Sequence, residues 1–501
     1  MTEKSIIVIG AGLAGLSAGC YAQMNGYRSH IFEHNSKPGG VATAWKRDSY
    51  LIDGGIHFLM GHRPGQPIYE LYRELGVKTD AFPDLITYGR LIDEASGVRV
   101  DITCDLERLR HDLKAIAPGD AGLIDDLFTG ACAMQGSTIL FDEGMGKPPE
   151  LMNPLDRLKQ FWDMRKLLKY FTGKYAKPLA GYARAAKSVL LRRVLENLFL
   201  PEVPVWFVFM LLALLADRQI GLLPKGCPGF VMPIEERYRA LGGTITYEAT
   251  VEEIIVEDDR AVGVRLTDGS THLSDVIISA ADGRSTIFKM LGGRYVDKET
   301  RERYGSWKLI RPVLMVSFGV SREFPDDPHM SFITLKDAIT TGTQEIGGIS
   351  LRIFNYGNGF APPGKTVVQV ILETEWDFWN DLQEERERYD AEKQRVAEEV
   401  LARLDAHYPG ISSLVEVTDV ATPYTTWRYT MNQKGAYMGW LPTPKELMTT
   451  IPRTLPGLAN FYMAGQWVLP GGGVPPCLYS GRHVVQIVCK RDRKPLSSTI
   501  G

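Results

Sequence analysis

The sequence lacks an apolar run long enough to cross a membrane, and it has no excess of charge of either sign. Its longest such run is the twelve-residue segment VWFVFMLLALLA at Val205–Ala216, whereas a spanning helix needs about 20 residues. Lysine plus arginine number 57 and aspartate plus glutamate 60, so a nucleic-acid partner is not expected, because such proteins concentrate basic residues. The apolar segment is therefore either a buried core helix or a surface that dips into a membrane or lines a lipid tunnel.

Cysteine is scarce and scattered. The six cysteines form no Cys-x-x-Cys pair, which argues against a structural zinc site or a disulfide framework and is typical of a reducing compartment. His57 and His62 lie five residues apart with no third ligand in view, so no metal site is predicted. The apolar stretch SIIVIG at Ser5–Gly10 follows no basic leader or cleavage site, which predicts a cytoplasmic protein without a signal peptide.

Glycine, in contrast, is plentiful, with 50 residues, and its first cluster comes early. Ser5–Ile9 is a short apolar run, as expected of a buried strand, and GAGLAG at Gly10–Gly15 follows at once. A helical pattern up to Asn25 and a second apolar run ending at Glu33 complete a strand–helix–strand unit. Together these elements predict a dinucleotide-binding site.

Each glycine of this cluster has an expected role. Gly10 makes the tight turn, Gly12 lets the backbone approach a pyrophosphate, and Gly15 lets the helix pack on the strand. The helix N-terminus favours an anion there. Glu33, 18 residues after Gly15, is placed to accept hydrogen bonds from ribose hydroxyls. This pattern alone does not distinguish FAD from NAD.

The segments that follow make the distinction. PGG at Pro38–Gly40 and LIDGGIHFLMG at Leu51–Gly61 give an acid-x5-Gly-Gly and an Asp-x-Gly layout that resembles the FAD-dependent amine oxidase and phytoene desaturase superfamily. PGGGVPP…SGR at Pro470–Arg482 and TPYTTWRYTMNQKGAYMGW at Thr422–Trp440 look like the branch of phytoene desaturases, carotenoid isomerases and retinol saturases. The resemblance covers nearly the whole chain and implies FAD as the cofactor.

A second strand–loop–helix pattern occurs near the C-terminus. NFYMAG reads as a strand ending at Gly465, LPGGGVPP is a glycine loop, and Cys477–Cys489 has helical spacing. Such a helix would point its N-terminus at the flavin ring, where its dipole would stabilise the anionic reduced flavin. The alternative is a helix that docks only for packing.

The predicted fold class is α/β, with a discontinuous Rossmann-type FAD-binding domain and an α+β substrate domain, because 501 residues exceed one compact core. The FAD-binding domain is assigned to residues 1–75, 223–294 and 451–495, the substrate domain to 76–222 and 295–450, and a tail to 496–501. In the substrate domain, VLMVSFGV and TVVQVILETE alternate like strands, and RYDAEKQRVAEEVLARLDAHYPG is an amphipathic helix.

The resemblance also places Val251 at the adenine and Ala280 near the pyrophosphate, and Val41 stands where desaturases often carry a basic residue. The residues expected to bind the cofactor are Gly10, Ala11, Gly12, Leu13, Ala14, Gly15, Glu33, His34, Gly39, Gly40, Val41, Gly55, Val251, Ala280, Gly465, Gln466, Gly473, Val474 and Pro475.

The resembled branch implies a long apolar isoprenoid, carotenoid or retinoid-like substrate that is desaturated, saturated or isomerised by hydride exchange with flavin N5. Eleven Lys or Arg against one acid, Asp163, lie between Arg157 and Arg193. Phe161, Trp162, Tyr170, Phe171 and Tyr175 are interleaved with them. A basic, aromatic, helix-prone segment suits an anionic bilayer surface. We therefore expect peripheral membrane contact through residues 157–216. The alternative is a solvated basic helix beside a core helix.

No side chain declares itself as the catalyst, because hydride transfer needs mainly positioning and a dry cavity. His57 is the candidate proton donor near the flavin, or else a histidine that braces the cofactor loop. Trp427, Arg428, Tyr437 and Trp440 either line the substrate cavity or pack under the sheet. No second glycine fingerprint for NADPH is present, so the electron acceptor or donor is not identified.

Two other functions remain open at this stage. A flavin amine oxidase would share the cofactor motifs, but the basic, apolar substrate region suits cationic amines poorly. A non-catalytic prenyl-lipid binding protein, such as the Rab GDP-dissociation inhibitors, would share the fold without the cofactor. The joint presence of the glycine turn, Glu33, the glycine pair and the C-terminal loop favours retention of the cofactor.

Overall fold

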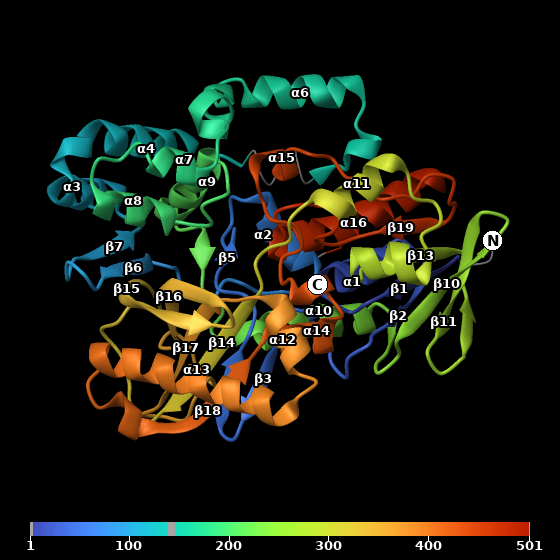
Figure 1. Ribbon diagram of the computed structural model, residues 1–501. Coiled ribbons are helices and arrows are strands. Elements are labelled where there is room, and N and C mark those ends of the chain that lie inside the picture. Colours follow the sequence, from blue (N-terminus) through green and yellow to red (C-terminus); the bar gives the residue numbers. More distant parts are fainter. Residues whose placement is uncertain (1–3, 139–145, 500–501) are drawn as a thin grey trace.

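Five parallel strands form the sheet around which the N-terminal glycine motif is built (Figure 1). The computed structural model describes residues 4–138 and 146–499. The strands, in sheet order, are β19 (Phe461–Met463), β13 (Val276–Ser279), β1 (Ser5–Ile9), β2 (Arg28–Phe32) and β9 (Thr244–Thr246). All five come from the stretches 1–75, 223–294 and 451–495, although they are far apart in the sequence.

The central strand β1 is buried on both faces, which explains its unbroken apolar run. Ile6 and Val8 pack into the core that contains α1 (Leu13–Met24), whereas Ile7 and Ile9 pack into a second core under a three-stranded antiparallel sheet. That sheet consists of β10 (Val251–Glu257), β11 (Arg260–Leu266) and β12 (Thr271–Leu273). A turn with Gly269 at φ +86° joins β11 to β12.

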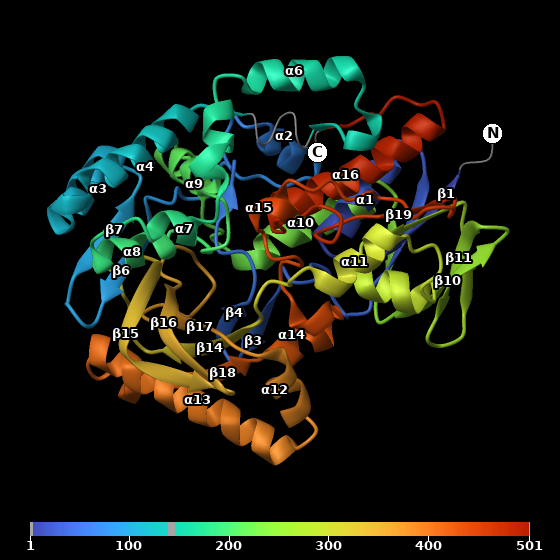
Figure 2. The same cartoon turned by 45° about the horizontal axis from the view of Figure 1, so that its top comes forward.

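Helix α16 (Val474–Arg491) lies against α1 and brings the C-terminal segment back to the motif (Figure 2). The approach is close, because a Cβ at Gly481 would overlap the carbonyl oxygen of Ala14. Ser17 also donates a hydrogen bond to the carbonyl of Leu478 at 2.7 Å. The predicted strand and helix near the C-terminus are confirmed as β19 and α16. Helix α10 (Gly226–Ala240) also packs on α1.

A seven-stranded sheet forms the second part of the molecule, and all its strands come from residues 76–222 and 295–450. In sheet order they are β18 (Val415–Ala421), β14 (Val313–Val320), β17 (Thr366–Glu373), β16 (Gln344–Ile353), β15 (Met330–Thr341), β6 (Thr87–Asp93) and β7 (Arg99–Thr103). Neighbours are antiparallel except β15 and β6. The two predicted strands are confirmed as β14 and β17.

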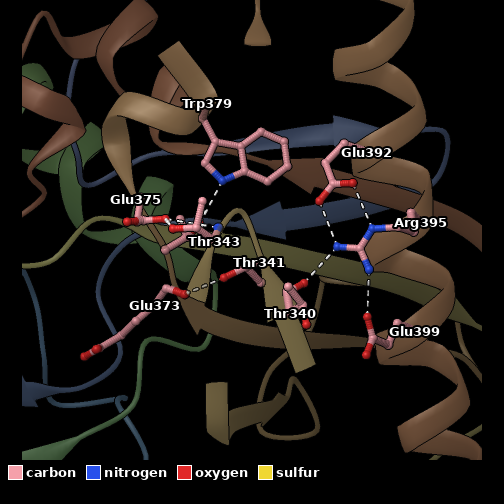
Figure 3. A network of polar contacts seen from close by, with 10 residues as sticks. Thr340, Thr341, Thr343, Glu373, Glu375, Trp379, Glu392, Arg395 and Glu399 are labelled. Atoms are coloured by element: carbon pink, nitrogen blue, oxygen red, sulfur yellow. Dashed lines mark hydrogen bonds and ion pairs between the residues drawn. The ribbon is translucent and has the colours of Figure 1, made fainter. Parts of the chain in front are cut away.

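Helix α13 (Arg386–His407) covers one face of this sheet and confirms the predicted amphipathic helix (Figure 1). Arg395 fixes the helix, since its guanidinium contacts Glu392 and Glu399 and donates to the carbonyl of Thr340 on β15 at 2.8 Å (Figure 3). The neighbouring α12 (Trp376–Leu382) is held by a 2.8 Å hydrogen bond from the Trp379 indole to Thr374.

A helical lobe completes the second part. It contains α3 (Leu106–Ile116), α4 (Ala121–Met134), α6 (Pro154–Met164), α7 (Leu179–Ala183), α8 (Val189–Glu196) and α9 (Val205–Ala216). Helix α9 is buried almost all round, which agrees with the core-helix alternative for this apolar segment. Three of its side chains nevertheless line the large cavity described below. Over the described residues, no helix is long and apolar enough to cross a membrane.

Further helices and strands lie outside the two large sheets and the helical lobe. They are β3 (Ala44–Arg47), β4 (Tyr50–Asp53), β5 (Leu59–Met60), α2 (Pro67–Glu74), β8 (Ile220–Gly221), α11 (Lys298–Ser306), α14 (Pro423–Thr430) and α15 (Pro444–Leu447). The described end of the tail is tied to the first part, because Ser497 donates to Asn25 at 2.7 Å and Arg237 donates to Thr499 at 2.9 Å.

Candidate functional site

A cavity of about 1670 Å³ lies between the two parts and is lined by residues of both. One wall consists of the glycine loops at the carboxyl ends of the parallel strands. The facing wall includes side chains of β14, β17 and β18, such as Met315 and Ile371. Because a single small-molecule site measures roughly 300–1,000 Å³, the cavity has room for more than one ligand.

The first glycine cluster shapes the cavity wall where β1 meets α1. Gly10 has φ +95°, a conformation that side chains rarely allow. A Cβ at Gly15 would overlap the carbonyl oxygen of Gly10, so helix and strand can approach only with glycine there. No side chain caps α1 at Gly12. The amides of the first turn therefore remain available to an anion in the cavity.

Glu33, just after β2, holds this turn in place. Its carboxylate accepts hydrogen bonds from the backbone N–H of Ala11 at 2.5 Å and of Asn35 at 2.8 Å. Burial raises the pKa of Glu33, and the two backbone hydrogen bonds act in the opposite direction. The carboxylate also lines the cavity, and its remaining lone pairs can accept hydrogen bonds from ribose hydroxyls.

The second glycine pair lies directly against the first cluster. The N–H of Gly39 donates to the carbonyl of Ala11 at 2.9 Å, and Gly39 and Gly12 form an isolated parallel bridge. Gly39 and Gly40 have φ values of +114° and +60°. The two loops together present bare backbone to the cavity, which is what an extended dinucleotide requires.

The C-terminal glycine loop closes the same cavity. Gly471, Gly472 and Gly473 have φ values of +102°, +55° and +82°, and α16 begins directly after them. The N–H of Gly465 is held by Ser480 of α16 at 2.7 Å. The N-terminal turn of α16 therefore faces the cavity, where its dipole favours negative charge.

Of the residues expected to bind the cofactor, all except Ala11 and Gly15 line the cavity. Ala11 lies behind its wall, where it contacts Glu33 and Gly39, and Gly15 packs under Gly10. This cradle of backbone amides, glycines and one buried acid fits FAD. Across the described residues, no group of three His, Cys, Asp or Glu side chains is placed to hold a metal ion.

His57 also lines the cavity, on the loop after Asp53. Among the described residues the imidazole has no hydrogen-bond partner. Burial lowers the pKa of His57 well below its usual range, and the guanidinium of Arg352 and the nearby His329 lower it further. At neutral pH this ring is therefore uncharged, and the role of His57 as a proton donor stays a prediction.

The loop that carries His57 is fixed by Asp53. Its carboxylate accepts the backbone N–H of Cys227 at 2.5 Å and of Gly55 at 3.2 Å, and burial raises its pKa. Of the four further candidates, Arg428 and Tyr437 line the cavity. Trp440 instead packs in a core with Tyr304, Trp307 and Trp467, and Trp427 lies outside the lining.

Sequence reasoning placed part of the substrate side of the cavity in residues 157–216 but did not identify Phe199 and Leu447 individually. An apolar arm there is lined by Met164, Phe171, Phe199, Trp206, Phe207, Met210 and Leu447. These side chains come from α6, α9, α15 and the segments between them. No periodic pattern links them, and only the aromatic-rich composition of the region gave a signal.

Comparison with known proteins agrees with this geometry. The model of the flavin containing amine oxidoreductase family matches residues 13–489. The chain belongs to this family. The cofactor is therefore FAD, as the cradle indicates, and the protein is an FAD-dependent oxidoreductase.

Curated relatives within this family align over nearly the whole chain. The chloroplastic prolycopene isomerase of Arabidopsis thaliana is 27% identical over 95% of this chain and 81% of its own length. The corresponding protein of Daucus carota is 25% identical over 96% and 79%. The lycopene-forming phytoene desaturase of Pseudescherichia vulneris is 23% identical over 97% and 99%.

Solved structures share the fold of this family member. An oxidoreductase from Methanosarcina mazei aligns with a TM-score of 0.60 at 18% identity, over 96% of this chain and 100% of the other. Wild-type putrescine oxidase with bound putrescine aligns with a TM-score of 0.60 at 13% identity, over 98% and 99%. These likenesses concern the fold alone.

Proposed function

We propose that the protein exchanges a hydride between FAD and a long carotenoid-like polyene, and that its main reaction is cis–trans isomerisation of that polyene. The apolar arm of the cavity carries this proposal. The first four curated relatives are prolycopene isomerases, at 24–27% identity, and the phytoene desaturases follow at 23–25%. These relatives favour a polyene over an amine as substrate.

The apolar arm suits a ligand without polar groups. The rings of Phe171 and Trp206 contact each other in a tilted arrangement with centroids 5.1 Å apart, and those of Phe199 and Phe207 do so at 4.8 Å. Aromatic and thioether side chains of this kind provide a large apolar contact area. A cationic amine would lose its hydration there without gaining a counter-ion, which is unfavourable.

The role of the protein chain in the reaction is to position the substrate and to exclude water from the cavity. Bound FAD supplies the hydride acceptor and donor, and the protein holds the polyene against it and excludes water. His57 is uncharged at neutral pH, so it places no positive charge beside the apolar substrate. A redox-neutral isomerisation requires no permanent general acid, which fits this arrangement.

We also propose that α6 contacts a membrane. None of its side chains is buried, and the helix lies at the rim of the molecule (Figures 1 and 2). Leu155, Leu158, Phe161 and Trp162 are 58–75% exposed, beside the basic residues of the same segment. An apolar face flanked by positive charge is typical of interfacial helices. On the same helix, Gln160 and Met164 line the cavity, so α6 would connect the membrane to the apolar arm.

The proposed function is tested by anaerobic visible spectroscopy of the FAD-loaded protein with a panel of polyenes, followed by product analysis. An isomerase leaves the oxidised flavin bands unchanged until dithionite is added. It then converts a poly-cis polyene to a more extended isomer while the flavin remains reduced. Bleaching of the oxidised flavin by a polyene would instead establish a desaturase. Production of peroxide and ammonia from amines, without any polyene conversion, would refute the proposal.

A further inference from the structure

A polar opening lies at a different part of the cavity from the apolar arm. We call this opening the polar mouth and define it by six cavity-lining residues: Trp45, Arg47, Arg386, Tyr389, Lys393 and Tyr424. They come from β3, α13 and α14, three elements that are distant in sequence. No role in binding FAD or an apolar substrate accounts for this group of cations and aromatic rings.

Asp419 of β18 joins the β3 side of the polar mouth to the seven-stranded sheet. Its carboxylate accepts the Trp45 indole N–H at 3.0 Å and contacts the Arg47 guanidinium at 2.6 Å. Trp45 also lies against Gly54, where a Cβ would come within 2.7 Å of the indole ring. The polar mouth thus adjoins the loop that carries His57.

Helix α13 supplies the opposite side. Arg386, Tyr389 and Lys393 recur at intervals of three and four residues, so they share one helix face. Arg395 anchors the helix to β15 (Figure 3), and this anchor keeps that face in place. The Tyr389 ring lies 5.4 Å from the Lys393 ammonium, and its centroid is 6.5 Å from that of Tyr424 on α14.

The charges at this opening do not balance. Arg47 pairs with Asp419 and Arg386 pairs with Asp390 at 2.6 Å. Lys393, by contrast, forms no ion pair within the described part of the chain. Lys37 is a second such cation among the residues that the structure describes, and its ammonium donates to the carbonyl of Ala44. Burial lowers the pKa of both lysines, and the nearby carboxylates of Asp419 and Asp390 offset this only in part at Lys393. Partly buried cations without carboxylate partners are unfavourable, and an anionic ligand would relieve this.

We propose that the polar mouth binds a nicotinamide dinucleotide, with its phosphates on Arg47, Lys393 and Arg386 and an aromatic ring against Trp45 or Tyr424. Guanidinium and ammonium groups are the side chains that bind phosphate, and aromatic faces accept a planar ring. Side chains would thus take the place of a second glycine fingerprint. The proposal rests on the FAD site and is independent of the polyene.

The bound nucleotide would serve as the electron donor to the cofactor. The C4–H bond of the reduced nicotinamide breaks, and its hydrogen leaves with both electrons to the oxidised flavin. The oxidised pyridinium dinucleotide then dissociates from the mouth. Two electrons leave the nicotinamide and two enter the flavin, so no other reductant or oxidant is required.

Binding and reduction are measured separately on the FAD-loaded protein. Isothermal titration with NADP⁺ and NAD⁺, neither of which can reduce the flavin, gives the affinity. Anaerobic mixing with NADPH or NADH then follows the loss of the oxidised flavin bands. ATP and inorganic phosphate serve as ligands that carry phosphate without a nicotinamide. We expect a dinucleotide to bind in preference to both and to bleach the flavin.

The variants Arg47→Gln, Lys393→Gln and their combination test the location of the site. We expect the double variant to weaken dinucleotide binding by about tenfold or more, with unchanged FAD content. Lys46→Gln is the matched control, because Lys46 is the exposed neighbour of Arg47 on β3 and does not line the cavity. FAD content and thermal unfolding show that each variant is folded.

Several outcomes would overturn the inference. These are no dinucleotide binding to the wild-type protein, equal binding of ATP without flavin reduction, or binding that the double variant leaves intact. Loss of affinity for anionic vesicles in the double variant, without any nucleotide binding, would assign the cations to lipid instead. If dithionite-reduced protein converts a polyene but NADPH neither binds nor reduces, this inference fails and the proposed function stands. If NADPH binds and reduces the flavin but no polyene is converted, this inference stands and the proposed function fails.

Discussion

The carboxylate of Glu33 and the backbone N–H of Ala11 form a 2.5 Å hydrogen bond that joins the end of β2 to the glycine turn after β1. The second oxygen of the same carboxylate accepts the N–H of Asn35. One buried acid thus fixes the spacing of two adjacent loops at the FAD site. The same side chain lines the cavity, so it shapes the site and also contacts its ligand.

Replacement of this acid is expected to weaken FAD binding. In Glu33→Gln the amide group can accept a hydrogen bond through only one atom, so one of the two backbone N–H groups loses its partner. We expect the Kd for FAD to rise roughly ten- to a hundredfold, as measured by fluorescence during reconstitution of the apoprotein. Glu257→Gln, an exposed acid on β10, is the control, and an equal effect in both variants would contradict the role of Glu33.

The glycine at position 15 is expected to be irreplaceable for steric reasons. A Cβ in Gly15→Ala would overlap the carbonyl oxygen of Gly10, which forces α1 away from β1. We expect a loss of about 1–3 kcal/mol in unfolding free energy, with poor FAD retention, measured by urea unfolding and by FAD content.

A glycine with open space around it provides the comparison. Nothing lies within 4 Å of a Cβ at Gly305 in α11. Gly305→Ala should therefore raise stability by up to about 1 kcal/mol, because alanine favours the helix. Equal destabilisation by both substitutions would show that crowding at Gly15 is not the cause.

The pH dependence of stability tests the buried histidines near the cavity. Burial and the guanidinium of Arg352 lower the pKa of His329 to about 3, compared with about 6.5 in an unfolded chain. Below about pH 6.5 the unfolded state therefore binds a proton that the folded state does not, so His329 lowers stability as the pH falls.

His329→Gln removes this effect. Relative to wild type, we expect the variant to gain up to about 1.4 kcal/mol of unfolding free energy per pH unit from about pH 6 to pH 4. Urea unfolding at several pH values measures the difference. A difference that does not change with pH would mean that His329 is charged in the folded state.

The exposed apolar face of α6 is expected to drive membrane binding. Because this helix buries no side chain, Leu158→Ser with Trp162→Ser should leave the fold intact. We expect about tenfold or greater loss of binding to vesicles that contain anionic lipid, measured by co-sedimentation. Leu273→Ser, at an equally exposed leucine on β12, is the control. Binding that persists in the double variant would place the membrane contact elsewhere.

The FAD-binding part of the fold could be predicted from the sequence because its signals are local. Gly10 has a positive φ, and a Cβ at Gly15 would overlap the carbonyl oxygen of Gly10, so both positions favour glycine. The apolar runs beside them have the length of buried strands. Helix α16 could be predicted in the same way, because its glycine loop and its helical spacing are adjacent in the sequence.

The rest of the site depends on contacts that no local pattern contains. Trp45 and Lys393 line one opening only because Asp419 fixes β3 on the sheet and Arg395 fixes α13. The pKa of His57 is lowered by its burial and by Arg352, which is distant in sequence. Hydropathy also could not decide whether Val205–Ala216 faces lipid or core, because its side chains are apolar all round, and only the packing around α9 answers this.

The order in which the chain is synthesised has a consequence for cofactor loading. Strand β1 lies at the centre of the five-stranded sheet, but β13 on one side of it and β19 beyond come from much later stretches of the chain. Helix α16, which packs on α1 beside the glycine turn, comes almost at the end of the chain. A nascent chain therefore cannot complete the FAD cradle until residues 461–491 have left the ribosome. Most of the protein is therefore synthesised before FAD can bind and stabilise the folded state.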